Sequence, residues 1–229
     1  MEHLPGGYTL CLSENAFPLS TDSMLLASFA KLSRKASVLD LGSGCGTLGL
    51  LLCASDSLCA VTGIELDPQA HAGALENISS NQLQNRMHSL CGDIRNIGTL
   101  VKPGSFHCCI SNPPYFSGGP ASKAHATARR NDCCTTEELF HAAAWAVKYG
   151  GDFFLVHRPE QLASIFACAR NNQLEPKRLC LVRHKPQDPV SLVLVHCRKG
   201  AKPGLLWEEL HLFESDGSPS DEYKKIYHL

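Results

Sequence analysis

Short apolar runs alternate with segments of helical periodicity along most of this chain. Residues 24–29, 48–53, 137–147 and 159–171 place apolar side chains at helical spacing. Runs rich in Val, Ile, Leu and Cys predict buried strands at residues 38–41, 59–64, 87–91, 106–111, 152–156, 178–182 and 190–197. This alternation predicts an α/β fold with a mostly parallel sheet and helices on both faces.

Glycines and prolines set the expected limits of several elements. Residues 148–151, which include two glycines, are expected to end the preceding helix before the next strand begins. Pro159 is expected at a helix start. The last two strands are joined through residues 186–189, which contain two prolines, and this favours an antiparallel edge. Residues 117–134 have weak periodicity and are expected to form a mobile loop over the functional site.

The first strand breaks into a glycine-rich turn. The segment Asp40-Leu-Gly-Ser-Gly-Cys-Gly46 follows an apolar run and precedes a helical pattern. Such a strand, turn and helix start lets the backbone approach a ligand closely and directs free N–H groups at it. The G-x-G-x-G spacing differs from the G-x-G-x-x-G dinucleotide fingerprint, and the turn has no Walker lysine.

Acidic residues follow the next two strands. Glu65 with Leu66 ends the strand at 59–64, and Asp93 follows the strand at 87–91. A carboxylate at such a position accepts hydrogen bonds from ribose hydroxyls in nucleoside-binding α/β folds. One acid alone is more often a solvated residue, but three acids after three successive strands, Asp40 included, favour a nucleoside site.

A fourth strand end carries Asn112-Pro113-Pro114-Tyr115. The Asn112 side-chain oxygen and the Pro113 carbonyl can accept both N–H bonds of a planar amino group. The two prolines restrict the backbone and hold that carbonyl in place. Tyr115 offers a face on which a base can stack. A Pro-Pro turn with a surface tyrosine is the alternative interpretation.

Together these segments resemble the class I S-adenosyl-L-methionine (AdoMet) dependent methyltransferases that methylate amino groups. Residues 20–29, 110–116, 128–129 and 223–227 resemble one family in particular, the bacterial tRNA(Val) adenine N6-methyltransferases, which modify the adenine next to the anticodon. The likeness covers nearly the whole chain, and its ends are more discriminating than the AdoMet motifs.

The resemblance implies a Rossmann-like class I methyltransferase fold, with a mostly parallel seven-stranded sheet, helices on both faces and an antiparallel C-terminal edge. It implies one domain over residues 1–229. Within this domain we expect an N-terminal lid segment at 1–35, a core at 36–199 and a C-terminal extension at 200–229.

The implied cofactor is AdoMet, which is released as S-adenosyl-L-homocysteine. The resemblance implies that the glycines shape the methionine end of its pocket, that Glu65 holds the ribose and that Asp93 contacts the adenine. Thr21 and Asp22 would close the pocket from the N-terminal side, or would serve only as a helix N-cap. The implied cofactor-binding residues are Thr21, Asp22, Asp40, Gly42, Gly44, Gly46, Glu65, Leu66, Asp93, Ile94 and Asn112.

The implied catalytic residues are Asn112, Pro113, Pro114 and Tyr115. They would hold a flipped-out adenine and stabilise positive charge on its N6 nitrogen during direct methyl transfer, without a strong general base. Basic residues just beyond this motif are expected to flank the base pocket and bind tRNA; they are Lys123, Arg129 and Arg130.

Three other functions fit parts of the same pattern. Asn-Pro-Pro-Tyr also resembles the release-factor glutamine N5-methyltransferases, although those usually carry an N-terminal helical domain. A DNA or ribosomal RNA amino-methyltransferase is the second alternative. The third is a module that binds AdoMet without catalysis.

Composition limits these interpretations. The 229 residues are 44% hydrophobic, which suffices for one α/β core. A formal net charge of −1 argues against a generally basic surface, so RNA binding would need a local patch. The twelve cysteines include no C-x-x-C pair, and adjacent ones would point to opposite sides of a strand. We therefore expect reduced thiols, no metal, no membrane span and a cytoplasmic location, with a monomer favoured. His107, within a predicted strand, is expected to be a packing residue.

Overall fold

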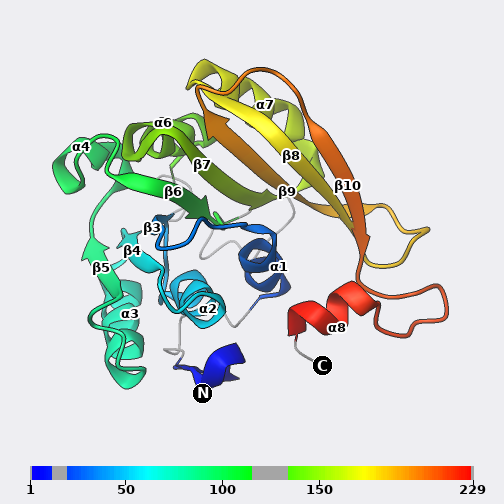
Figure 1. The fold of residues 1–229 in the computed structure, drawn as a ribbon, viewed down its shortest axis with the longest axis horizontal. Coiled ribbons are helices and arrows are strands. Elements are labelled where there is room, and N and C mark those ends of the chain that lie inside the picture. The colour runs from blue at the N-terminus through cyan, green and yellow to red at the C-terminus, as the bar shows by residue number, and fades with distance from the viewer. Residues whose placement is uncertain (1, 12–19, 115–133, 228–229) are drawn as a thin grey trace, which may run out of the picture.

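The computed structural model describes residues 2–11, 20–114 and 134–227. Its main feature is an eight-stranded sheet with the order β10-β8-β9-β7-β6-β3-β4-β5 (Figure 1). The strands are β3 (Ser37–Leu41), β4 (Ala60–Glu65), β5 (Met87–Cys91), β6 (Phe106–Ser111), β7 (Val147–His157), β8 (Leu174–Arg183), β9 (Val190–Lys199) and β10 (Leu206–His211). A separate pair, β1 (Glu2–His3) and β2 (Thr9–Leu10), is antiparallel.

Helices cover both faces of the sheet, as predicted. On one face lie α1 (Thr21–Phe29), α2 (Thr47–Ser55) and α3 (Pro68–Ser80), and on the other lie α4 (Ile97–Leu100), α6 (Thr136–Ala146) and α7 (Leu162–Asn171). The C-terminal helix α8 (Asp221–Tyr227) lies beside α1 (Figure 1). In the part of the chain that the structure describes, there are also three short 3-10 helices: η1 (Pro5–Gly7), η2 (Ile94–Asn96) and η3 (Pro159–Gln161).

Two hydrophobic clusters, one on each face, hold the layers together. The strand alternation appears in the adjacent pair Cys108 and Cys109, which are both buried but belong to opposite clusters. The prediction that adjacent cysteines point to opposite sides of a strand is confirmed at this pair. The eleven cysteines of the described residues all have free thiols.

Capping side chains explain where several helices begin. Thr135 and Glu138 form a reciprocal capping box at the start of α6, and Asp67 accepts the Gln69 N–H at the start of α3. Pro159 begins η3, directly before α7, as expected. Within the described residues, no helix is long and apolar enough to cross a membrane.

Two features of the sheet differ from the prediction. The sheet has eight strands and not seven, because β10 adds to β8 in parallel. The antiparallel pairing predicted for residues 178–182 and 190–197 is confirmed in β8 and β9. However, β9 lies between β7 and β8, and the outer edge is formed by β10, which is parallel to β8. This strand was missed because it is an edge strand whose first four residues are all exposed, so its sequence lacks the alternation of a half-buried strand.

The glycines at 150 and 151 do not separate a helix from a strand. Helix α6 ends at Ala146 and β7 begins at the next residue, with both glycines inside the strand. The pairing with β6 shifts between Phe106 and Cys108, so the extra residues of β7 form a bulge, in which Gly150 has a φ of +76°. Glycine adopts a positive φ easily and is therefore typical both of bulges and of helix C-termini. The sequence signal is the same in the two cases, which explains the wrong prediction.

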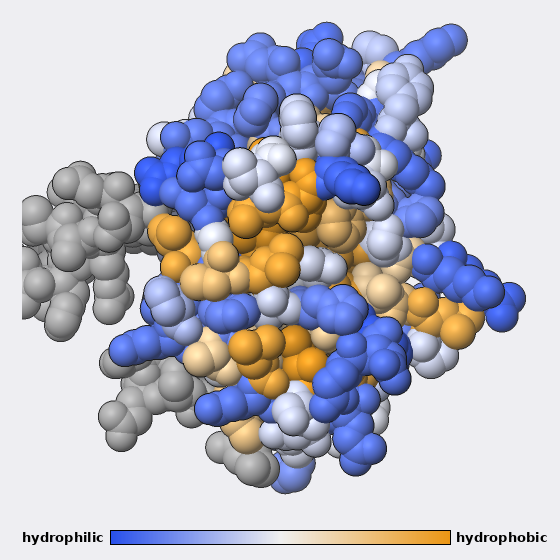
Figure 2. All heavy atoms as spheres, turned by 90° about the vertical axis from the view of Figure 1, so that its left-hand side faces the viewer, coloured by the Kyte–Doolittle hydropathy of each residue, from blue (hydrophilic) through white to orange (hydrophobic). Residues whose placement is uncertain are grey.

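One side of the molecule is formed by the edge strand β5 with α3 and α4 (Figure 1). Figure 2 faces this side and shows apolar residues in its middle, with hydrophilic residues around them.

Candidate functional site

The predicted polar positions meet at one edge of the sheet. Strands β6, β3, β4 and β5 are neighbours and run parallel, so their carboxyl ends lie together. The register pairs Asp40 with Gly63 and Ile110, and Glu65 with Cys91. The glycine turn, Glu65, Asp93 and Asn112 therefore follow four adjacent strand ends, where open α/β sheets bind their ligands.

The glycine turn has a backbone that side chains rarely permit. Gly42, Gly44 and Gly46 have φ angles of +75°, +55° and +87°. A Cβ built at Gly42 or Gly44 meets nothing within 4 Å among the described residues, so the backbone borders open space there. A Cβ at Gly46 would lie 2.6 Å from the Met87 Cε atom, because this glycine packs where α2 begins. The turn can therefore cradle a ligand.

Backbone N–H groups hold the Glu65 carboxylate at the end of β4. Its Oε2 atom accepts the Gly44 N–H at 2.7 Å, and its Oε1 atom accepts the Asp67 N–H at 2.8 Å. Each oxygen retains a lone pair for another donor. The carboxylate is thus joined to the glycine turn and oriented to accept hydroxyl groups.

Asp40 lies beneath this turn and is only 1% exposed. Within the described residues, neither of its carboxyl oxygens has a hydrogen-bond partner. Burial, and secondly the negative charge of Glu65, raise the pKa of Asp40 from 3.8 to about 8. A buried carboxyl group that receives no hydrogen bond from the described residues is suited to a ligand whose positive charge lies close to it.

Asp93 follows β5 and is held by its own turn. It accepts the Arg95 N–H at 2.9 Å and also pairs with the Arg95 guanidinium. The hydrogen bond from the Arg95 side chain lowers the pKa of Asp93. Ile94 is half-buried in η2, while Leu66, after β4, is 43% exposed. These apolar side chains follow neighbouring strand ends.

Asn112, Pro113 and Pro114 follow β6 directly, as predicted. The Asn112 Nδ2 atom donates to the Ser23 Oγ atom of α1 at 3.0 Å, which joins the motif to the N-terminal helix. Just before it, the buried Ser111 hydroxyl donates to the Leu41 carbonyl at 2.7 Å and ties the ends of β6 and β3 together. The other predicted members of this group lie outside the described residues: Tyr115, Lys123, Arg129 and Arg130.

Thr21 and Asp22 are in the first turn of α1, but neither is its N-cap. The N-cap is Ser20, whose side chain accepts the Ser23 N–H at 3.2 Å. The alternative interpretation of Thr21-Asp22 as the cap is therefore wrong. The Thr21 Oγ1 atom instead accepts a hydrogen bond from the Tyr227 hydroxyl at 3.0 Å, which connects α1 to α8.

Two structurally important side chains were not identified from the sequence. Ser23, 7% exposed, holds Asn112, and Asn77, fully buried in α3, holds the glycine turn. The Asn77 Nδ2 atom donates to the carbonyls of Cys45 and Cys11, and its Oδ1 atom accepts the Cys11 N–H. An asparagine at a buried position of a helix is a signal that could have indicated such a role.

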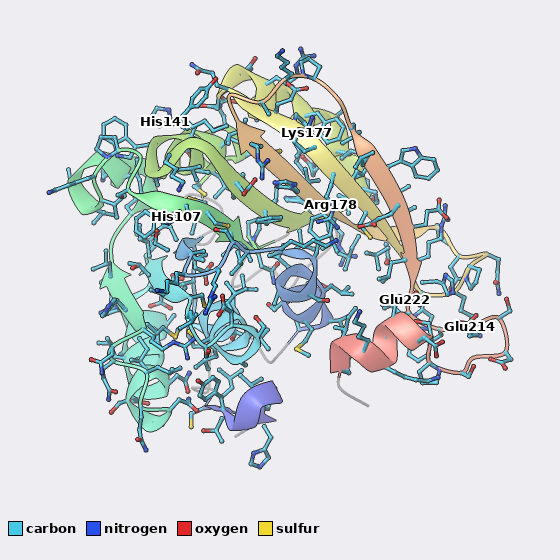
Figure 3. The ribbon with its side chains drawn as sticks, in the orientation of Figure 1. His107, His141, Lys177, Arg178, Glu214 and Glu222 are labelled. Carbon is cyan, nitrogen blue, oxygen red and sulfur yellow. The ribbon has the colours of Figure 1, made fainter. Side chains whose placement is uncertain are left out.

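His107 lies at the start of β6, at the opposite end from Asn112 (Figure 3). Its Nδ1 atom lies 2.7 Å from the Ser37 Oγ atom, so it joins the starts of β6 and β3. The expected packing role is in agreement with this contact. Within the described residues, no group of three or more His, Cys, Asp or Glu side chains could hold a metal ion.

Comparisons with known proteins agree with this geometry. Residues 19–166 match the family described as methyltransferase small domain. A tRNA1(Val) (adenine(37)-N6)-methyltransferase of Bacteroides fragilis is 30% identical over 225 residues, which are 96% of this chain and 92% of that protein. A protein of the same name from Vibrio vulnificus is 28% identical over 213 residues, covering 92% of this chain and 87% of the relative.

A solved structure has the same fold. The crystal structure of a predicted O-methyltransferase from Agrobacterium tumefaciens superposes with a TM-score of 0.77 and 22% identity, over 91% of this chain and 96% of that one. At this identity the match supports the fold alone. With the family match over more than half of its length, and relatives at 30% identity over nearly all of it, the chain belongs to the methyltransferase small domain family and to the group of tRNA1(Val) (adenine(37)-N6)-methyltransferases.

Proposed function

We propose that this protein transfers a methyl group from AdoMet to the N6 nitrogen of an adenine in tRNA, namely the adenine 3′ of the anticodon in tRNA(Val). The observation that carries the proposal is the position of Asn112-Pro113 at the end of β6, beside the glycine turn and Glu65 on the neighbouring strands. The relatives over nearly the whole chain are named for this activity.

The residues of the site fit AdoMet on four counts. The open, positive-φ backbone at Gly42 and Gly44 leaves room for the methionine part, and Glu65 is oriented to accept ribose hydroxyls. Leu66 and Ile94 offer apolar contact for the adenine, with Asp93 at the rim. The Asp40 carboxyl, which has no hydrogen-bond partner among the described residues, favours the positive charge of this cofactor. When bound, AdoMet supplies the methyl group.

Asn112 and Pro113 would act on the nitrogen that accepts the methyl group. An adenine amino group is a weak nucleophile, because its lone pair is delocalised into the ring. Two fixed acceptors, the Asn112 Oδ1 atom and the Pro113 carbonyl, would take its two hydrogen bonds and leave the lone pair directed elsewhere. The same oxygens would stabilise positive charge as it develops on the nitrogen. No strong general base is then needed.

The base must leave its stack to reach this pocket, at a cost of a few kcal/mol. We propose that Tyr115 stacks on it, which is worth roughly 1–3 kcal/mol, and that Pro114 stiffens the motif. Contacts with tRNA are proposed for Lys123, Arg129 and Arg130, which follow the motif in the sequence. Pro114 is the last described residue before a gap, and the other four lie outside the described part of the chain: Tyr115, Lys123, Arg129 and Arg130.

The remaining proposals concern the organisation of the protein. We propose that residues 1–35, through Thr21 and Asp22, help close the cofactor pocket, that 36–199 form the core and that 200–229 form an extension. β10 of that extension joins the core sheet, and α8 contacts α1. Finally, we propose that the protein acts on tRNA in the cytoplasm and that it is a monomer.

The test is transfer of labelled methyl from AdoMet to separate pools of unmodified tRNA, ribosomal RNA and protein, followed by digestion of the products. The proposal expects N6-methyladenosine in tRNA, and in tRNA(Val) when single species are tested. A tRNA in which adenine 37 is replaced by guanosine is the matched control and should remain unlabelled. Label in protein glutamine, or in ribosomal RNA alone, would contradict the proposal.

A further inference from the structure

The Asn112 side chain can serve the proposed reaction in only one of its two orientations. An amide group has an oxygen that accepts hydrogen bonds and a nitrogen that donates them, and the two ends are almost equal in size. A half-turn about the terminal bond would present the nitrogen to the target amino group, and two donors would then oppose each other. Some contact must therefore select the orientation.

Ser23 makes that contact. Its Oγ atom lies 3.0 Å from Asn112 Nδ2 and accepts a hydrogen bond from it, although the two residues are 89 positions apart in the sequence. Because the nitrogen is held toward α1, the Oδ1 atom, which is the acceptor end of the amide, points away from Ser23. Ser23 is 7% exposed, so water does not replace its hydroxyl easily.

A second serine fixes the hydroxyl of the first. The Ser20 Oγ atom accepts the Ser23 N–H at 3.2 Å as the helix cap and lies 3.2 Å from the Ser23 Oγ atom, to which it donates. The Ser23 oxygen thus receives hydrogen bonds from Ser20 and from Asn112. This arrangement favours Ser23 as an acceptor toward the amide, which only the nitrogen end of Asn112 can satisfy.

We infer that Ser23 is a positioning residue that orients the Asn112 amide, so that its oxygen faces the amino group to be methylated. The inference rests on the proposed function and adds a residue to it. Helix α1 does not need this hydroxyl for its own packing, because Met24, Leu25 and Leu26 bury its apolar side and Ser20 caps it. A purely structural role for the Ser23 hydroxyl is therefore disfavoured.

Single-turnover and steady-state kinetics of Ser23→Ala test the inference in the full chain. We expect kcat to fall at least about tenfold, equivalent to about 1.4 kcal/mol, while the Kd for AdoMet changes less than about twofold. Ser23→Thr, which keeps a hydroxyl, should recover most of the kcat. Ser80→Ala is the matched control, because Ser80 is an exposed helical serine whose hydroxyl donates to the Glu76 carbonyl; it should leave kcat within about twofold. Unchanged kcat in Ser23→Ala, or an equal loss in Ser80→Ala, would overturn the inference.

A second measurement does not depend on the substrate. In protein labelled with ¹⁵N-asparagine, the Asn112 side-chain amide signals are identified by their loss in Asn112→Asp. We expect one amide proton to exchange slowly with water in the wild type, and faster exchange with a shifted signal in Ser23→Ala. Unaltered signals would refute the contact itself. If the wild type methylates no tRNA but the signals shift as expected, the proposed function fails while the orientation of Asn112 stands.

Discussion

Asp40 is the proposed cofactor-binding residue whose protonation should depend most directly on the ligand. Burial, and then the charge of Glu65, raise its pKa to about 8, so it is largely protonated at neutral pH in the unliganded protein. A cation bound beside it favours the ionised form and draws the proton off. If the proposed cofactor binds there, ligand binding and proton release are linked at this residue.

This linkage predicts how AdoMet affinity depends on pH. Between pH 6 and about 8, binding must ionise Asp40, so the affinity should rise with pH, by at most about tenfold per unit, and level off above the pKa. Calorimetry in two buffers of different ionisation enthalpy would detect the released proton. Asp40→Asn should abolish this proton release. S-adenosyl-L-homocysteine, which lacks the sulfonium charge, should release less. A proton count near zero in the wild type at pH 7 would contradict the linkage.

Two further variants should separate binding from transfer. Asn112→Ala removes an acceptor proposed for the methylated nitrogen, so kcat should fall by about 100-fold or more, with AdoMet Kd within about threefold. Glu65→Ala removes the acceptor proposed for the ribose, and Kd should rise by about 10- to 100-fold, which matches hydrogen bonds to a charged group worth about 1.5–3 kcal/mol. Equilibrium dialysis with labelled AdoMet and single-turnover rates give the two values. Parallel loss of binding and transfer in both variants would disprove these separate roles.

At the scale of elements, α3 holds the N-terminal segment and the glycine turn together. Asn77 bonds to Cys11 and to the Cys45 carbonyl, and Asn81 bonds to the N–H and carbonyl of Thr9. The two amides thus act on the N-terminal segment as a neighbouring strand would. The position of the turn depends on α3 as well as on β3.

Replacement of Asn77 should therefore destabilise the fold. Asn77→Ala leaves the Cys11 N–H and two carbonyls without their partner in a buried region, and we expect a loss of about 2–4 kcal/mol in the free energy of unfolding. Urea denaturation would measure it. Asn96→Ala, at an exposed residue without a side-chain cap bond, is the control and should change stability by less than about 0.5 kcal/mol. Equal stability of the two variants would show that the Asn77 network contributes little.

The C-terminal elements form a second link to the site. Phe213, Tyr223 and Tyr227 contact one another in series, with ring centroids 5.1 and 4.3 Å apart. Tyr227 then donates to Thr21, two residues before Ser23. The end of the chain thus helps to hold the helix that carries the contact to Asn112.

At the scale of the whole molecule, the buried acid also affects stability. An acid whose pKa is raised on folding binds a proton more tightly in the folded state than in the unfolded one. The stability of the unliganded protein should therefore fall as pH rises from about 4 to about 8, because ionisation of Asp40 is favoured by unfolding.

The slope of that loss should be at most about 1.4 kcal/mol per pH unit from this residue. Chemical denaturation of the wild type and of Asp40→Asn at several pH values separates the contribution of Asp40 from that of other titrating groups. The difference in stability between the two proteins should grow with pH in favour of the variant and stop growing above about pH 8. A constant difference would show that folding does not shift the pKa of Asp40.

The sequence by itself determined where the strands end and which chemistry follows them. Apolar runs that stop at Gly42, Glu65 and Asn112 predicted β3, β4 and β6 closely, because buried parallel strands need such runs and the turns after them need glycine, proline or polar residues. The same local signals failed at Gly150 and at β10, where a bulge and an exposed edge strand resemble a helix end and a loop.

Only the tertiary structure decided which side chains meet. The contact of Ser23 with Asn112 and the bonds of Asn77 to Cys11 join residues 89 and 66 positions apart. Periodicity reports which side of an element is buried, but not which polar group on a distant element lies opposite. The burial of Asp40 is of the same kind, since its raised pKa comes from layers packed around β3 and from a charge on β4. The physical reason is that these properties depend on packing between elements, which no single segment contains.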